Sequence, residues 1–195
     1  MHINDSFHLS ELRRRNMADQ TMDILNLQFT DIGFGNQHLI FLVGNEEFGV
    51  DVLRVQEMIR YSVPVKVPNS PHSVSGVINF RGEVIPVLDM RRIFQLEPGH
   101  YNDYTVIVVV ETGEKIFGLI VDRVLDMVSL AEDNIQPTPE FSSKPKTQYL
   151  RSMGKIGNRP ILMIDLDKLV DFQEIDEIFA PVNSTDDKKE ETKEF

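Results

Sequence analysis

Histidines are the first residues to consider, because imidazole is a common metal ligand and general base. The five histidines stand at positions 2, 8, 38, 72 and 100. No two of them have the i, i+4 spacing that places two ligands on one helical face. The chain has no cysteine, which excludes disulfides, thiolate zinc sites and cysteine nucleophiles. We therefore expect no metal centre and no cofactor.

Other catalytic motifs are also missing. Residues 33–38 (GFGNQH) begin like a dinucleotide-binding loop, but they lack the last glycine and precede a predicted strand rather than a helix. Neither a GxxxxGK[ST] phosphate loop nor a GxSxG nucleophile elbow occurs. Paired carboxylates remain, but with 31 Asp and Glu residues some acids lie near each other by chance, so solvated strand faces are the favoured interpretation.

Composition narrows the class of protein. The 195 residues are 41% hydrophobic and 26% charged, which is typical of one folded domain or two small ones. The net charge of −11 opposes binding to nucleic acid and to anionic lipid. No apolar run approaches the ~20 residues of a membrane span, and the first residues lack the pattern of a secretion signal. We expect a cytoplasmic protein without direct membrane insertion.

Short strands dominate the predicted secondary structure. Turn residues Gly44 and Asn45 predict a hairpin over 39–51, and a second hairpin is expected over 76–88 around Arg81 and Gly82. A single strand is predicted over 55–59. Residues 89–96 (DMRRIFQL) predict a short helix that begins at an aspartate cap.

The second half of the chain repeats the first. A shift of 69 positions places FGVDVLRVQEMI, from Phe48, over FGLIVDRVLDMV, from Phe117. A shift of 76 places VIPVLDMRRIF over PILMIDLDKLV, so that Asp89 meets Asp165. The pattern indicates a duplication. Each half has enough short strands for a small closed barrel, so we expect two barrels side by side that share an apolar seam.

A family resemblance rests on the block GVINFRGEVIPVLDMR at 76–91. This block is similar to the signature of CheW, the coupling protein family of bacterial chemotaxis. The similarity continues through 44–59, 117–130 and PTPEF at 137–141. The resemblance implies a non-enzymatic adaptor, without cofactors, that joins the cytoplasmic tips of chemoreceptors to the regulatory domain of the histidine kinase CheA.

The resemblance also implies a fold class and a domain division. The fold is expected to be mainly β, with two SH3-like five-stranded β-barrel subdomains packed side by side and short helices. We expect an N-terminal extension over 1–36, partly helical or flexible, and a CheW-like domain over 37–182 that ends in a helix. Its two intertwined subdomains are expected at about 37–98 and 99–170. Residues 183–195 are polar and acidic, which predicts a disordered tail.

Receptor contact is implied for eight positions by their similarity to the family. They are Val55, Glu57, Gly76, Asn79, Arg81, Val106, Gly118 and Met127. Glu57 and Arg81 are expected to form a half-buried pair, which would cost roughly 3–5 kcal/mol to break from one side. Val55, two residues before Glu57, is expected on the same strand face. Without the family, Arg81 reads as a solvated turn residue, Val55 as core, and the two glycines as relief of strand bends.

Kinase contact is implied for Val52 and Phe141. Phe141 follows two prolines, so it loses little conformational entropy on docking, although it could instead pack beneath its own loop. Three alternatives stay open: a CheW-like scaffold in a pathway unrelated to motility, a hydrolase with an acidic pair in the groove between barrels, and a nucleic-acid-binding protein. The net charge argues against the last of these.

Overall fold

The computed structural model describes residues 36–113, 115–137 and 148–170, and most of them lie in short strands. The strands are β1 (Gln37–Val43), β2 (Glu46–Asp51), β3 (Val55–Arg60), β4 (Val74–Phe80), β5 (Glu83–Asp89), β6 (Val106–Thr112), β7 (Lys115–Val121), β8 (Arg123–Ser129), β9 (Ile135–Pro137), β10 (Leu150–Ile156) and β11 (Arg159–Ile164). The helices are η1 (Val52–Arg54), α2 (Met90–Ile93), η2 (Glu132–Asn134) and α3 (Leu166–Val170). The expected mainly-β fold with short helices is confirmed.

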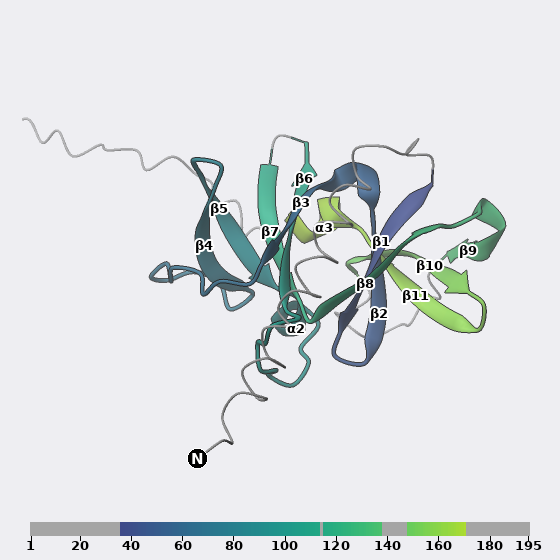
Figure 1. The fold of residues 1–195 in the computed structure, drawn as a ribbon, viewed down its shortest axis with the longest axis horizontal. Helices are drawn as coiled ribbons and strands as arrows, with labels where there is room; N and C mark the ends of the chain where they lie inside the picture. Colours follow the sequence, from purple (N-terminus) through teal and green to yellow (C-terminus); the bar gives the residue numbers. More distant parts are fainter. Residues whose placement is uncertain (1–35, 114, 138–147, 171–195) are drawn as a thin grey trace, which may run out of the picture.

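The strands form two sheets that lie side by side (Figure 1). One sheet has six strands in the order β8-β1-β2-β11-β10-β9, and the other has five in the order β3-β6-β7-β5-β4. Each sheet therefore takes strands from both halves of the chain. Four strand pairs make these exchanges: the parallel pairs β5–β7 and β11–β2, and the antiparallel pairs β3–β6 and β1–β8.

Strand pairing follows the internal repeat. In the five-stranded sheet Val87 pairs with Gly118, and in the six-stranded sheet Met163 pairs with Gly49. Gly49 and Gly118 are 69 positions apart, and Val87 and Met163 are 76 apart, as in the two sequence shifts. The second half of the chain therefore joins the five-stranded sheet in the same way as the first half joins the six-stranded sheet. This arrangement has pseudo-twofold symmetry.

Irregularities of the strands repeat as well. A register shift at Gln56 interrupts the pairing of β3 with β6, and a shift at the equivalent Leu125 interrupts the pairing of β8 with β1. The β4–β5 and β10–β11 hairpins have equivalent shifts at Ser75 and Arg151. Because a bulge turns the following side chains to the other face of a sheet, its repetition keeps the same faces buried in both halves.

The largest core cluster joins the two sheets. Phe41 and Phe48 from the six-stranded sheet belong to it, together with Phe117 and Leu119 from the five-stranded sheet. Two smaller clusters lie on the other faces, one around Ile107 and the second around Ile161. Burial of apolar area at the shared cluster ties the sheets together, so the predicted apolar seam is present.

Neither sheet closes through hydrogen bonds within the described ranges. The end strands β3 and β4 of one sheet are not paired, nor are β8 and β9 of the other. The six-stranded sheet also exceeds the expected five strands, because the three-residue β9 pairs with β10. At the equivalent place beside β4 there is only one isolated bridge, between Val65 and Val77.

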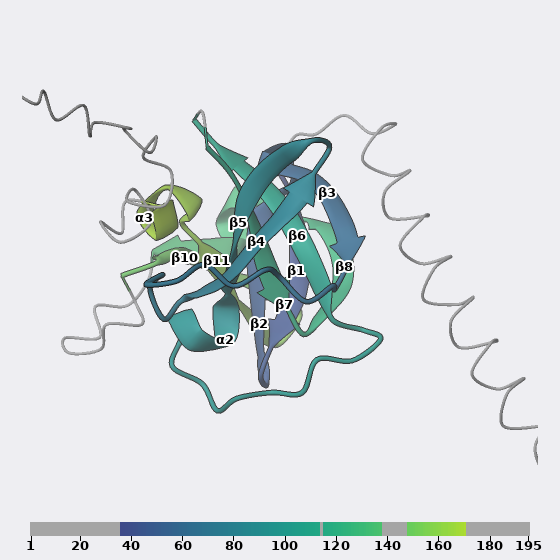
Figure 2. The same ribbon diagram turned by 90° about the vertical axis from the view of Figure 1, so that its left-hand side faces the viewer.

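Helix α2 starts as predicted but is shorter. Asp89 is its N-cap, and the Asp89 side chain accepts a hydrogen bond from the Arg91 amide at 3.0 Å. The helix ends at Ile93, and Gln95 has a positive φ of 51°, which an α-helix cannot accommodate. Figure 2 shows the segment after α2 running along the lower edge of the molecule before β6 begins.

Candidate functional site

The turn of the β4–β5 hairpin brings Arg81 to Glu57 on β3. The Nη2 atom of Arg81 lies 2.6 Å from Oε2 of Glu57, so the expected pairing of these side chains is present. The Arg81 guanidinium also lies 5.0 Å from the ring centroid of Phe80, which is within the range of a cation–π contact. The asparagine of the proposed receptor surface, Asn79, accepts a hydrogen bond from the Gly82 amide at 3.0 Å.

Arg81 has an unusual backbone conformation. Arg81 and Gly82 have φ angles of 51° and 95°, and two positive angles are the mark of the type I′ turn that suits a two-residue hairpin. This conformation is unfavourable for a residue with a Cβ atom. The ion pair with Glu57 and the contact with Phe80 offset part of that cost. The turn therefore holds the guanidinium at a fixed place on the surface.

The Glu57–Arg81 pair is more exposed than predicted. The Arg81 side chain is 67% exposed and the Glu57 side chain 33%. An exposed ion pair contributes only about 0–1 kcal/mol, since water and salt screen it, so the exposure of Arg81 favours a smaller cost than the several kcal/mol expected for a half-buried pair. Exposure leaves the pair accessible to another protein.

Val55 and Glu57 point to opposite faces of the sheet, so the prediction of a shared face is wrong. The physical reason is the bulge at Gln56: Val55 pairs with Val110, whereas Glu57 pairs with Val109. Val110 belongs to the core between the sheets and Val109 to the core on the other face. Val55 packs against the shared core, and Met127 on β8 packs against the same core from the six-stranded sheet.

Three of the predicted receptor positions lie in the interior. Val106 is part of the shared core. A Cβ atom at Gly118 would lie 2.7 Å from Cγ2 of Ile107, and one at Gly76 would lie 2.3 Å from the carbonyl oxygen of Val65. Both glycines thus permit close packing of this chain against itself, and all three positions lie inside the fold rather than on an exposed surface.

The kinase-contact prediction for Val52 also falls on a buried side chain. Val52 is 2% exposed, whereas the next residue of η1, Leu53, is 62% exposed. Strand alternation gave no way to choose between these neighbours, because Val52 lies in a 3-10 helix rather than in a strand. Phe141 lies outside the described residues.

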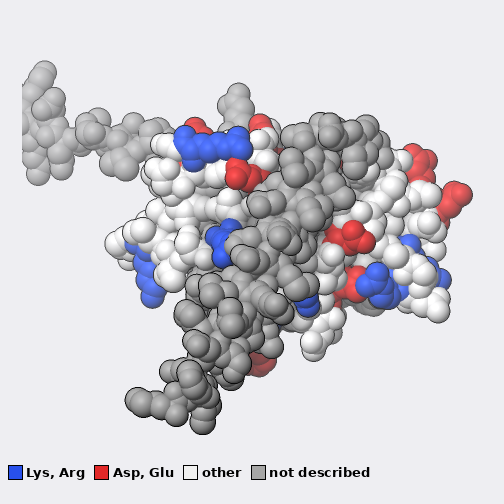
Figure 3. Space-filling model, viewed as in Figure 1, with Lys and Arg blue, Asp and Glu red and all other residues white. Residues whose placement is uncertain are grey.

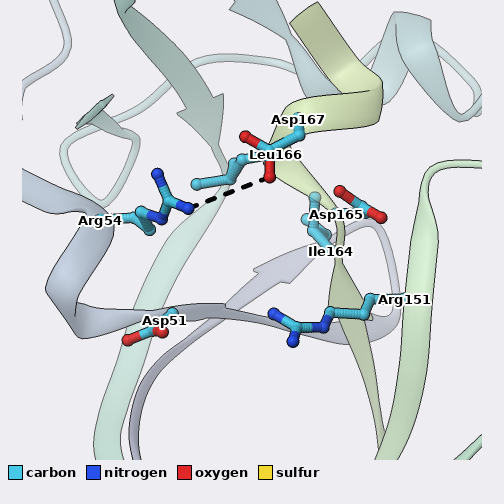
Figure 4. A pocket seen from close by; sticks show the side chains of 7 residues that line it. All are labelled: Asp51, Arg54, Arg151, Ile164, Asp165, Leu166 and Asp167. Atoms are coloured by element: carbon cyan, nitrogen blue, oxygen red, sulfur yellow. Dashed lines mark ion pairs between the residues drawn. The ribbon is translucent and has the colours of Figure 1, made fainter. Parts of the chain in front are cut away.

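A small polar pocket opens beside η1 and α3 (Figure 4). Its volume is about 80 Å³, and its lining residues are Asp51, Arg54, Arg151, Ile164, Asp165, Leu166 and Asp167. Arg54 lies 4.0 Å from Asp167, and Asp165 lies 3.3 Å from Lys168. Within the described part of the chain, His, Asp and Glu side chains form no cluster of three that could bind a metal ion.

His38 lies close to this pocket. It pairs across the sheet with Asp51. Burial lowers the pKa of His38 below its usual 6.5, although the negative charge of Asp51 opposes that change. The neutral imidazole is therefore the favoured form at neutral pH.

Buried Asp89 forms a second polar cluster with Tyr101 and Arg92. The Tyr101 hydroxyl donates to Oδ2 of Asp89 at 2.6 Å, and Nε of Arg92 lies 3.1 Å from the same oxygen. Burial raises the pKa of Tyr101 to about 12, and the hydrogen bond and charge of Asp89 add to the effect. The Tyr61 ring contacts the Tyr101 ring with centroids 4.3 Å apart and the two planes tilted by 31°. The cluster therefore ties Tyr101, in the segment after α2, to the N-cap of that helix.

Charge is mixed over the surface. On the described atoms in the view of Figure 3, Lys and Arg side chains lie among Asp and Glu side chains and gather in no single-sign patch. Within the residues described by the structure, no helix is long and apolar enough to cross a membrane.

Comparison with known proteins gives a consistent result. Residues 37–174 match the family model of the CheW-like domain. The chain is 38% identical over 141 residues to the chemotaxis protein CheW of Klebsiella aerogenes, which covers 72% of this chain and 85% of that protein. It is 36% identical over 136 residues to a probable chemotaxis protein CheW of Rhizobium etli, covering 69% of this chain and 88% of that protein.

A solved structure agrees with these sequence matches. The crystal structure of the scaffolding protein TtCheW from Thermoanaerobacter tengcongensis aligns with a TM-score of 0.66 and 27% identity, over 71% of this chain and 94% of that one. The two sheets, the repeated halves and these matches lead to one conclusion. The chain belongs to the CheW family of non-enzymatic chemotaxis coupling and scaffold proteins.

Proposed function

We propose that this protein binds the cytoplasmic tips of chemoreceptors together with the regulatory domain of the histidine kinase CheA, in the cytoplasm beneath receptor arrays. Membership of the CheW family is the observation that carries the proposal. An adaptor of this kind raises the effective concentration of kinase at the receptor without making or breaking a covalent bond. A signal passes when two receptor states bind the adaptor with different affinity.

The receptor surface proposed here centres on the Glu57–Arg81 pair. The Arg81 side chain is exposed and the Glu57 side chain half-buried, and the turn holds Arg81 in a conformation that a residue with a Cβ atom seldom adopts. Strained residues of this kind concentrate at binding sites. Asn79 lies on the same hairpin. Val55 and Met127 complete the surface from the edge of the shared core.

Co-sedimentation with chemoreceptor-containing membranes and CheA tests the proposal. We expect the wild-type chain to sediment with both, and Arg81→Glu to lose the receptor-dependent part. Lys66→Glu makes the same change of charge at another exposed residue and is the matched control. If wild type does not sediment, the adaptor role is wrong. If wild type and Arg81→Glu sediment equally, only the assignment of this surface is wrong.

A further inference from the structure

Glu57 and Asp126 occupy equivalent places in the two halves of the molecule. They are 69 positions apart, on the equivalent strands β3 and β8. Glu57 pairs with Val109 across its sheet, and Asp126 pairs with Ile40, which is the residue equivalent to Val109. Each acid follows a bulge on an end strand, so the two carboxylates have the same structural setting.

The two acids differ in their cations. Arg81, in the β4–β5 turn, forms an ion pair with Glu57, whereas the equivalent residue of the β10–β11 turn is Gly157. The two turn residues have nearly the same backbone conformation, with φ angles of 51° and 60°. Asp126 is exposed, and its Oδ1 accepts a hydrogen bond from the amide of its neighbour Met127 at 2.8 Å. No Lys or Arg among the described residues forms an ion pair with it.

The residues next to the two acids also differ: those on β3 are polar or buried, whereas those on β8 are apolar and partly exposed. Gln56, the bulged residue of β3, donates a side-chain hydrogen bond to Glu111. The equivalent residue of β8 is Leu125, whose side chain is 38% exposed. Met58 on β3 is buried, while the equivalent Met127 on β8 is half-buried. Met127 lies on the face of the sheet opposite Asp126, because Met127 pairs with Leu39 of the shared core and Asp126 pairs with Ile40. Strand β8 therefore presents its carboxylate next to one exposed apolar side chain, that of Leu125.

We propose that Asp126 binds a lysine or arginine of the chemoreceptor tip, and that an apolar residue beside that cation contacts Leu125. The partner cation of Asp126 thus comes from the receptor, whereas the partner cation of Glu57 is Arg81 of the same chain. This inference rests on the proposed function and adds the chemistry of the partner segment. A carboxylate beside an exposed apolar side chain selects a basic residue beside an apolar one, because charge complementarity fixes the register of contact and apolar burial adds affinity.

Titration of the full-length chain against chemoreceptor-containing membranes tests the role of Asp126. We expect Asp126→Asn to raise the Kd about two- to five-fold, which is the range for one exposed ion pair, and to weaken its dependence on salt. Asp126→Lys is expected to raise the Kd further, and Asp126→Glu to bind like wild type. Asp133→Asn removes a charge from another exposed aspartate and is the control.

A second variant tests the role of Asp126 by a change in the β10–β11 turn. Gly157→Arg places a cation at the position equivalent to Arg81, where a Cβ atom would meet nothing within 4 Å. The new arginine is expected to pair with Asp126 and to weaken receptor binding about as much as Asp126→Asn does. Circular dichroism and the urea midpoint of each variant check that the fold is unchanged.

The outcomes separate this inference from the proposed function. If wild type binds the membranes and both Asp126→Asn and Asp126→Lys bind equally well, the role of Asp126 is wrong while the adaptor role stands. If these variants lose affinity for CheA and keep it for the membranes, the assignment to the receptor is wrong. If wild type fails to bind the membranes, both are wrong.

Discussion

Arg91 of α2 and Asp122, between β7 and β8, form an ion pair with two contacts. Nε of Arg91 lies 2.7 Å from Oδ1 of Asp122, and Nη2 lies 2.7 Å from Oδ2. The same carboxylate accepts a hydrogen bond from the Gly44 amide at 2.7 Å, and Arg91 also donates to the carbonyl of Glu97. The cluster joins the turn of β1–β2, helix α2 and the end of β7, so it ties both sheets together near one end.

Replacement of Asp122 by alanine should therefore reduce stability. The change leaves the partly buried Arg91 guanidinium and the Gly44 amide without their acceptor. We expect a loss of about 1–3 kcal/mol in the free energy of unfolding, measured by urea denaturation. Asp103→Ala removes an exposed carboxylate from a loop and should change stability by less than about 0.5 kcal/mol. Equal effects of the two changes would contradict the role of the ion pair.

Alanine at Gly118 should destabilise more than alanine at the equivalent Gly49. At Gly118 the new Cβ would meet Cγ2 of Ile107 at 2.7 Å and Val87 at 3.3 Å, and both are stiff β-branched side chains. At Gly49 it would meet the flexible Met163 side chain and the tip of Ile40. We expect a cost of about 1–3 kcal/mol at Gly118 and less at Gly49.

Thermal unfolding and receptor binding, measured on the same samples, check this expectation. Gly118→Ala should lose receptor binding only to the extent that the protein unfolds. A stable Gly118→Ala variant with weak receptor binding would show that Gly118 belongs to the contact surface after all.

The repeat was the part of the fold that the sequence predicted best. The aligned residues Gly49 and Gly118 do occupy equivalent places, and Asp89 does cap α2. The exchange of strands between the sheets was not predictable in this way, because periodicity describes a strand's faces and not its neighbour. The bulge at Gln56 leaves no signal in the sequence pattern, which is why strand alternation wrongly predicts one shared face for Val55 and Glu57.

The sequence likewise predicts some residues of the candidate site and not others. Arg81 and Glu57 were found because a turn and a family motif mark them. The Arg91–Asp122 pair was missed, since its partners are 31 residues apart and neither stands in a recognisable motif. Burial of Val106 and Gly118 depends on which strands lie beside them, which the local pattern does not contain.

Tyr101 should make stability depend on pH above about pH 10. Its pKa is raised from 10.0 to about 12 in the folded protein, so folding favours the protonated phenol. The stability that this group contributes is fully present below pH 10 and is lost as the pH rises through 12. We expect Tyr101→Phe to cost about 1 kcal/mol at pH 7 through the hydrogen bond to Asp89, and to remove this part of the alkaline decline.

Urea unfolding of both proteins between pH 8 and pH 12 measures the difference. Absorbance of tyrosinate during a pH titration gives the pKa directly. A Tyr101→Phe variant whose stability falls in parallel with wild type over the whole range would contradict the assignment.

Exchange of the charges in the Glu57–Arg81 pair should separate stability from binding. Because the pair is exposed, Arg81→Glu should change the free energy of unfolding by no more than about 1 kcal/mol. The double variant Glu57→Arg, Arg81→Glu restores an ion pair with the charges reversed. We expect it to recover stability but not affinity for chemoreceptor membranes, since each charge on the partner attracts one sign and repels the other. Full recovery of binding would mean that the pair only positions the hairpin.

Reconstitution of kinase control is the most direct test of the proposed adaptor role. Chemoreceptor-containing membranes and CheA are mixed with and without this protein, and autophosphorylation of CheA is measured before and after addition of attractant. We predict that the protein raises kinase activity in the presence of receptors and that attractant then lowers it. Kinase activity that is the same with and without the protein, or that ignores attractant in its presence, would contradict the adaptor role.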